Sequence, residues 1–293
     1  MSTSSLKELR KVLLVIHPSK PEALEFATIL ADSLIEEGFA VFSNSHHAIP
    51  SVVPLDEIDS VGNLEIAVVL GGDGTILRAA ELVRGFPIPI LGVNLGKVGF
   101  LAEVSQPKIS EIVRAICESK LHPEPRLTLR YEILRDGKIV SSGWALNEVT
   151  IERNHAQMVE LFLQIDDRPV SRWGCDGVIC STPTGSTAYA FSAGGPVVWP
   201  EVSALVLLPL AAHALFSRPM VVSPDSQIAV DIESQEALLS ADGMRKFELI
   251  QNDRILLKRD SELVLLSHID NSVFTDRLVA KFKLPIEGWR GGK

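Results

Sequence analysis

The chain has 293 residues, 46% hydrophobic and 22% charged, which suffices for one large or two ordinary domains with a substantial core. Its formal net charge is −9, with acidic residues spread along the chain. This balance argues against nonspecific binding of nucleic-acid backbones, which needs clustered lysine and arginine, but it allows a small anionic ligand in a local site.

The first third of the chain alternates short apolar runs with helical patterns. Residues 11–16 (KVLLVI) are typical of a strand buried on both faces. Residues 21–38 begin with proline, end with glycine and space their apolar residues by three or four, which predicts a helix. Further strands are predicted at 39–42, 65–70 and 88–94, and a helix at 75–85. The fold class is therefore α/β with a doubly wound parallel sheet, whose ligands bind at the carboxyl ends of strands.

One such strand end carries the glycine-rich sequence LGGDGTIL, in which Gly71, Gly72 and Gly74 surround Asp73. Bare backbone before a helix favours anions such as phosphate, so a carboxylate at its centre needs an explanation. The sequence is neither a Walker A motif nor a GxGxxG fingerprint. The plain structural alternative is a strand-to-helix turn in which Asp73 caps the helix.

The pattern changes after a predicted helix at 107–120. The proline-rich stretch HPEPR, at 122–126, is interpreted as a domain boundary. Short strands with polar turns follow, including a hairpin about Asp136-Gly137, and they predict a mostly antiparallel β domain built as a sandwich or as layered sheets. We expect an α/β domain at 1–124 with the glycine-rich loop, a β-rich domain at 125–270, and a C-terminal helix and tail at 271–293 that pack back on the first domain.

Two segments of the β-rich part carry unusual polar groups. Residues 176–196 (DGVICSTPTGSTAYAFSAGGP) crowd hydroxyl side chains among glycines, which lets a ligand lie close to the backbone, although a capped helix start would explain part of the pattern. The pair Asn147-Glu148 interrupts a strand-like run, and by itself such a pair is usually the solvent face of a strand.

Cysteine content and hydropathy bear on the compartment. The three cysteines are an odd number without CxxC spacing, which supports neither a disulfide framework nor a zinc site, and we expect no resident metal among the site residues. The N-terminus has no secretory pattern, and the apolar stretch at 204–216 is too short to span a bilayer. We expect a cytoplasmic protein that binds neither a membrane nor nucleic acid.

Taken together, LGGDGTIL, VNLGKVGFLAEV at 93–104, ALNEV and the segment at 176–196 resemble the NAD kinases over nearly the whole chain. The GGDG element also occurs in diacylglycerol, sphingosine and 6-phosphofructokinase relatives, whereas the Asn-Glu pair and TPTGSTAY are more specific to NAD kinases.

The resemblance implies roles for individual residues. Asp73 would be the catalytic acid beside the 2′-hydroxyl of the adenosine ribose, with Gly72 and Gly74 giving room for phosphates. The β-rich domain would bind NAD, and Asp176 would contact the ribose on the nicotinamide side, often from a neighbouring subunit. The remaining residues implied to line the dinucleotide are Phe100, Asn147, Glu148, Thr184, Thr187, Ala188, Tyr189 and Ser192. Arg78 and Arg218 are candidate phosphate contacts.

The implied activity is transfer of the terminal phosphate of ATP, or also of polyphosphate, to NAD to make NADP, with Mg²⁺ or another divalent cation accompanying ATP. A homodimer or homotetramer is expected. Two alternatives remain open: a lipid kinase of the diacylglycerol or sphingosine type, and a non-catalytic nucleotide sensor. Asn147-Glu148 and TPTGSTAY argue against the first, and the presence of Asp73 argues against the second.

Overall fold

The computed structural model describes residues 9–44, 49–57, 61–96, 99–102, 108–269 and 273–286. The chain forms two compact units. The first unit comprises Met1–Pro125 and Val264–Lys293, and the second unit comprises Arg126–Leu263. The second unit is thus inserted in the sequence of the first.

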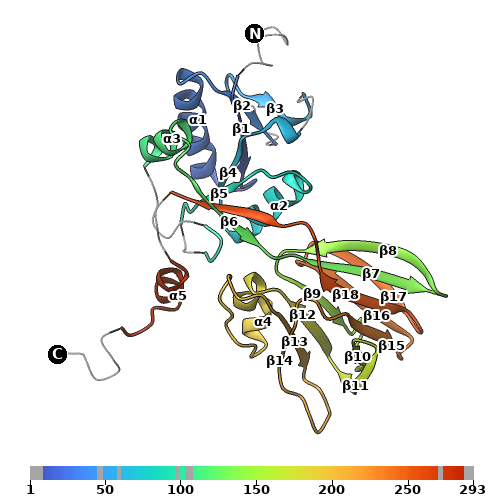
Figure 1. Ribbon diagram of the computed structural model, residues 1–293. Coiled ribbons are helices and arrows are strands. Elements are labelled where there is room, and N and C mark those ends of the chain that lie inside the picture. Colours follow the sequence, from blue (N-terminus) through green and yellow to red (C-terminus); the bar gives the residue numbers. More distant parts are fainter. Residues whose placement is uncertain are drawn as a thin grey trace. The chain divides into compact units, whose positions relative to one another are not determined.

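The first unit is built on a seven-stranded sheet of order β3-β2-β1-β4-β5-β19-β6 (Figure 1). Its strands are β1 (Lys11–Ile16), β2 (Ala40–Ser43), β3 (Val53–Pro54), β4 (Ile66–Leu70), β5 (Ile90–Val93), β6 (His122–Arg126) and β19 (Val264–His268). The pairs from β3 through β19 are all parallel. The strand order reverses between β1 and β4, which is the switch point where open α/β sheets bind ligands. The predicted fold class, a doubly wound parallel sheet, is confirmed.

The helices of the first unit are α1 (Pro21–Glu36), α2 (Asp73–Val83), α3 (Ile109–Cys117) and α5 (Phe274–Phe282). Because the crossovers from β1 and from β4 run in opposite directions, α1 and α2 cover opposite faces of the sheet, as Figure 1 shows. Pro21 begins α1, and Gly38, at φ 85°, follows its end, so both predicted helix signals act as expected. The buried face of α1 packs with α3 and the apolar strands in one core cluster.

Two strands of this sheet differ from the sequence-based expectation. The stretch HPEPR is strand β6 rather than a linker, because a sheet edge tolerates prolines that cannot donate to a ladder. Strand β19, which was expected within the β-rich domain, pairs in parallel with β5 and belongs to the first unit.

The second unit contains two six-stranded sheets, of orders β11-β10-β15-β18-β7-β8 and β14-β13-β12-β9-β16-β17. The strands of the first sheet are β7 (Leu129–Arg135), β8 (Lys138–Ala145), β10 (Val159–Ile165), β11 (Arg168–Cys175), β15 (Ile228–Ile232) and β18 (Arg254–Arg259). Those of the second sheet are β9 (Glu148–Glu152), β12 (Gly177–Ser181), β13 (Leu205–Leu210), β14 (Met220–Val222), β16 (Glu236–Ala241) and β17 (Arg245–Ile250). Neighbouring strands in both sheets are antiparallel. Apolar side chains from both sheets form one core cluster, so the sheets pack face to face.

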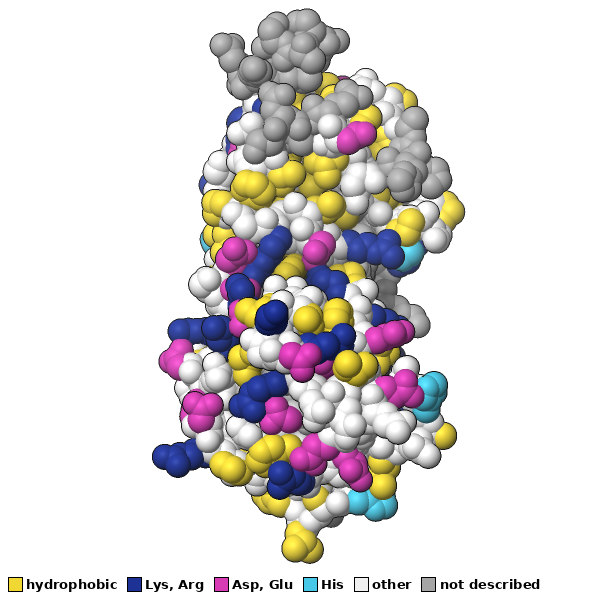
Figure 2. Space-filling view, turned by 90° about the vertical axis from the view of Figure 1, so that its right-hand side faces the viewer, with side chains coloured by type: hydrophobic (Ala, Val, Ile, Leu, Met, Phe, Trp, Pro, Cys, Tyr) yellow, Lys and Arg dark blue, Asp and Glu magenta, His cyan; other side chains and the backbone are white. Residues whose placement is uncertain are grey.

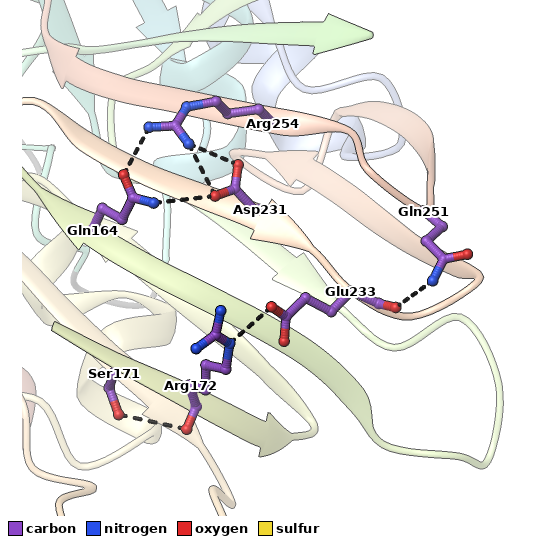
Figure 3. Close-up of polar contacts among 7 residues, drawn as sticks. All are labelled: Gln164, Ser171, Arg172, Asp231, Glu233, Gln251 and Arg254. Atoms are coloured by element: carbon purple, nitrogen blue, oxygen red, sulfur yellow. Dashed lines mark hydrogen bonds and ion pairs between the residues drawn. The ribbon is translucent and has the colours of Figure 1, made fainter. Parts of the chain in front are cut away.

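The outer face of the first of these sheets carries cross-strand polar pairs (Figure 3). Arg254 binds the Asp231 carboxylate at 2.9 and 3.0 Å and also donates to Gln164 at 3.0 Å. On the neighbouring strand Arg172 pairs with Glu233 at 2.9 Å. Such pairs stabilise an exposed sheet face without needing a ligand. Figure 2 likewise shows basic and acidic side chains interspersed over the face it displays.

Within the described residues, no helix is both long and apolar enough to cross a membrane.

Candidate functional site

The Asn147-Glu148 pair lies where β8 passes into β9, in the second unit. The two side chains belong to residues only 8% and 7% exposed. The pair is therefore not the solvent face of a strand, and that alternative is wrong. Buried polar groups are normally hydrogen-bonded, so the residues around this pair determine what it can bind.

The hydroxyl-rich turn surrounds the pair from the other side. Strand β12 pairs with β9 so that Ser181 lies opposite Glu148, and the Thr182 N–H donates to the Asn147 carbonyl at 2.8 Å. A Cβ atom on Gly185 would lie 2.1 Å from the same carbonyl oxygen, so only glycine fits there. Two motifs well separated in sequence thus form one site.

Asp242, which was not predicted from the sequence, fixes the backbone of this site by accepting hydrogen bonds from it. Its buried carboxylate accepts the backbone N–H groups of Leu146 at 2.9 Å and Asn147 at 2.7 Å. Arg245 donates to the same carboxylate at 2.9 Å and lies over the Trp144 ring. The only local signal was an Asp-Gly turn between β16 and β17, which reveals nothing about a partner almost a hundred residues earlier.

The Glu148 carboxyl is in an unusual electrostatic environment. Burial, followed by the nearby negative charge of Asp242, raises the pKa of Glu148 from its ordinary 4.5 to about 8. Its Oε2 atom is buried and has no hydrogen-bond partner among the residues that the structure describes. A protonated carboxyl can donate a hydrogen bond as well as accept one, so Glu148 offers a ligand either function.

The turn itself consists of η4 (Thr184–Thr187) and α4 (Tyr189–Ser192). Ser186 is satisfied internally, because its hydroxyl donates to the Val198 carbonyl at 3.1 Å and accepts the Val198 N–H at 2.9 Å. Among the predicted contacts, Thr184 is buried, Thr187 and Ala188 are half-buried, and Tyr189 and Ser192 are exposed. The accessible side chains of the turn are thus the ones available to a ligand.

Two carboxylates flank the turn. Partial burial, together with Glu152, which accepts a hydrogen bond from the phenol, raises the pKa of Tyr189. Asp176 is half-exposed, and its Oδ1 lies 2.9 Å from Arg153 Nε. Arg153 therefore fixes the orientation of Asp176, another contact that the sequence did not indicate.

In the first unit the glycine-rich loop joins β4 to α2 at the switch point. Gly72 is the N-cap residue of α2, and Asp73 is its first residue. A Cβ on Gly71 would meet Thr75 Oγ1 at 2.4 Å, so packing within the loop requires that glycine. A Cβ on Gly72 or Gly74 would meet no described atom within 4 Å. Internal packing therefore does not explain those two glycines, whereas close approach of a ligand would.

The Asp73 side chain does not cap the helix, so the structural alternative is wrong in that form. Its Oδ2 accepts the N–H of Phe100 at 3.1 Å, and its Oδ1 accepts the N–H of Leu101 at 3.2 Å. A Cβ on Gly99 would lie 2.2 Å from Oδ1, so that glycine makes room for the carboxylate. Asp73 thus anchors the segment 99–102 while remaining partly exposed.

Phe100, expected near adenine, is 7% exposed. Its ring packs on Phe274 and Phe282 of α5, with centroid separations of 6.1 and 5.5 Å. Arg78 is exposed in the second turn of α2, and Arg218 is exposed between β13 and β14, in the other unit. Within the described residues, no three His, Cys, Asp or Glu side chains gather as they would around a metal ion.

Comparison with known proteins decides the family. Residues 12–121 match the ATP-NAD kinase N-terminal domain, and residues 146–265 match the ATP-NAD kinase C-terminal domain. The chain is 46% identical to an NAD kinase of Thermobifida fusca, covering 96% of this chain and 92% of that relative. It is 45% identical to an NAD kinase of Mycobacterium tuberculosis, covering 96% and 98%. The chain belongs to the NAD kinase family.

Solved structures share the fold of this chain. A yeast NADH kinase complexed with NADH has the same fold, with a TM-score of 0.84 at 24% identity, covering 97% of this chain and 89% of the other. An NAD kinase from Archaeoglobus fulgidus in complex with ATP gives a TM-score of 0.71 at 27% identity, covering 94% and 99%.

Within this NAD kinase, the structure brings together one set of predicted residues in the second unit: Asn147, Glu148, Thr184, Thr187, Ala188 and Tyr189. It brings Gly72, Asp73, Gly74 and Phe100 together in the first unit. Asp176 lies at the start of β12 beside Arg153 rather than within the turn. The role of each residue toward a ligand stays a prediction.

Proposed function

We propose that this NAD kinase transfers the terminal phosphate of ATP to the 2′-hydroxyl of the adenosine ribose of NAD and so contributes to NADP biosynthesis. The observation that carries the proposal is the buried Asn147-Glu148 pair, enclosed by the hydroxyl-rich turn and held by Asp242. Such a polar pair with a free carboxyl oxygen suits a ligand with hydroxyl and ring-nitrogen groups.

The chemical roles follow from the side chains. A secondary hydroxyl must lose its proton when it attacks the terminal phosphorus, and a positioned carboxylate such as Asp73 can accept it. Asn147 and Glu148 would orient the ribose and adenine, so that the reacting hydroxyl is presented in one geometry. Gly72 and Gly74 would let phosphate groups approach the backbone at the start of α2.

A divalent cation such as Mg²⁺ fits this arrangement if it arrives with ATP. Magnesium in phosphoryl-transfer sites is usually held by one or two carboxylates, substrate phosphates and water. Asp73 is the carboxylate of the loop that would accompany it, and the cation would supply charge neutralisation of the triphosphate.

The predicted homo-oligomer and cytoplasmic location stay predictions. Asp176 is half-exposed, so it is accessible to a ligand held by another subunit. We also retain the proposal that Thr187, Tyr189 and Ser192 line the dinucleotide.

The test is a coupled assay of NADP formation with purified protein, Mg²⁺ and ATP. Parallel reactions replace ATP by polyphosphate, NAD by NADH, or NAD by diacylglycerol and sphingosine. NADP formation from NAD supports the proposal. Lipid phosphorylation without NADP would favour the lipid kinase alternative, and NAD binding without any turnover would favour the sensor.

A further inference from the structure

Lys20 stands directly after the loop that leaves β1, where it is the N-cap residue of α1. The loop is tied to the next strand in the sheet, because the His17 N–H donates to the Leu70 carbonyl at 3.0 Å. Leu70 is the residue immediately before the glycine-rich loop. Lys20 therefore lies at the same edge of the sheet as Gly71, Gly72 and Asp73.

The Lys20 side chain extends toward the loop after β5. A Cβ atom built on Gly96 would lie 4.0 Å from Lys20 Nζ. Gly96 is held in a turn by its N–H, which donates to Asn94 Oδ1 at 2.9 Å. Because β4 lies between β1 and β5 in the sheet, a side chain from the β1 loop that reaches the β5 loop crosses the end of β4. The Lys20 ammonium thus lies near the end of β4, where the glycine-rich loop begins.

This ammonium has no anionic partner within the part of the chain that the structure describes. Two other cations of the first unit that the structure describes, Arg10 and Arg78, are differently placed. Arg10 precedes β1, at the opposite edge of the sheet, and binds the Glu65 carboxylate. Arg78 lies in the second turn of α2 and is exposed. A cavity of about 270 Å³ beside Lys20, lined by His17, Ser19 and Pro21, leaves room for an anionic group.

We propose that Lys20 binds the phosphate chain of the phosphoryl donor beside the glycine-rich loop. The inference rests on the proposed function. Open glycine positions admit the phosphates but bring no full charge, and Asp73 repels them. A lysine whose side chain extends from the β1 loop toward the β5 loop supplies the missing positive charge as a point contact that any polyphosphate chain can use. Lys20 would therefore act on donor binding and leave the dinucleotide-binding groups of the second unit unaffected.

The first experiment compares Lys20→Met, Lys20→Arg and the wild type in steady-state kinetics. We expect Lys20→Met to raise the KM for ATP about 10- to 100-fold, as loss of a charged contact does, while the KM for NAD stays within about twofold. Lys20→Arg should recover most of the ATP affinity because it keeps the charge. Lys120→Met is the matched control, since Lys120 is exposed after α3 and pairs with Glu118. Lys20→Gln replaces Lys20→Met should the latter not fold.

The second experiment measures binding of inorganic tripolyphosphate by calorimetry. Tripolyphosphate carries the donor chemistry without a nucleoside, and its Kd should rise for Lys20→Met but not for Lys120→Met. If the wild type binds tripolyphosphate through Lys20 yet makes no NADP, the proposed function fails while this inference stands. Unchanged ATP KM and unchanged tripolyphosphate Kd in a folded Lys20→Met protein would overturn the inference, whatever the outcome for NADP.

Discussion

Asp73 occupies the first position of α2, and its two carboxylate oxygens accept the N–H groups of Phe100 and Leu101. This gives one side chain a structural task beside the chemical one that we propose. The two tasks respond differently to substitution, because a structural anchor affects unfolding whereas a proton acceptor affects turnover.

We expect Asp73→Asn to lower kcat by roughly 10²–10⁴-fold, the usual contribution of a positioned acid or base. Asparagine keeps one carbonyl oxygen for one of the two N–H groups, so stability should fall by about 1–3 kcal/mol. The Kd values for ATP and NAD should hold or decrease, because a negative charge near the phosphates is removed. The measurement is kcat with both Kd values and a thermal melt. Near-normal turnover in the folded variant would show that Asp73 has only the structural role of binding the segment 99–102 and is not the proton acceptor.

Asp242 and Asn147 form a second test at the residue scale. Asn147→Ala should raise the KM for NAD about tenfold or more, because buried partners on the ligand would lose their hydrogen bonds. Asp242→Asn should raise the KM for NAD as well, although Asp242 is not proposed to contact the ligand, because the substitution weakens the hydrogen bond that positions the Asn147 backbone. Kinetics with NAD and with ATP separate this from general damage, which would alter both KM values. If NAD kinetics were unchanged in the folded Asp242→Asn protein, that positioning role would be refuted.

Glu148 makes stability depend on pH. Its folded pKa of about 8 lies above the ordinary 4.5, so its contribution is fully present below pH 4.5 and is lost as the pH rises through about 8. Between those values the protein should lose up to about 1.4 kcal/mol per pH unit from this group. Glu148→Gln, which cannot ionise, should flatten the decline in melting temperature between pH 5 and 8. Glu160→Gln, on an exposed residue, serves as the control. Parallel pH profiles for wild type and Glu148→Gln would contradict the assignment.

The resemblance to the NAD kinases predicted Asn147, Glu148 and the turn at 184–189 as parts of one site, and the structure brings these residues together, while their roles toward a ligand stay predictions. The resemblance was not enough for Asp242, Arg153 or Lys20, because each acts through a contact with a residue distant in sequence or on another loop. A burial pattern could not be predicted either, so the solvent-face alternative for Asn147-Glu148 stayed open until the fold was known.

At the scale of elements, α5 stabilises the segment that Asp73 anchors. Phe274 and Phe282 pack on the ring of Phe100. The N–H groups of Phe100 and Leu101 are the two that the Asp73 carboxylate accepts. Arg277 of the same helix is 2% exposed and contacts His268 of β19 at 3.1 Å. The helix was predicted from the sequence, but its aromatic contacts could not be, since they join residues far apart in the chain. Strand β6 was missed for a different reason, because two prolines in five residues normally indicate a break.

We expect Phe274→Ala to destabilise the protein by about 3–5 kcal/mol, the usual cost of removing a buried phenylalanine side chain. It should also lower kcat, because Phe100 loses a packing partner next to the Asp73 contact. Denaturant unfolding and kinetics measure both effects. Val273→Ala, at an exposed neighbouring position, is the control. A loss of stability with unchanged kcat would show that α5 is uncoupled from the glycine-rich loop.

At the scale of the whole molecule, we expect a homodimer or homotetramer. The motivation is Asp176, which in the family resemblance serves a neighbouring subunit, together with the sheet surfaces that the second unit offers for symmetric pairing. Sedimentation equilibrium over a range of concentrations measures the state, and activity is followed over the same range. A stable and fully active monomer would refute the expectation.

The sheet order β5-β19-β6 also governs how the protein is made. A ribosome releases β5 and β6 early, but β19, which lies between them, only after all of Arg126–Leu263 has been synthesised. Until β19 is synthesised, β5 is therefore an edge strand, and its free backbone groups can pair with a strand of another chain. The second unit, by contrast, is complete in the emerging chain before the first can close. The last strand translated is thus the one that finishes the sheet carrying the glycine-rich loop, so a truncated chain cannot complete that sheet.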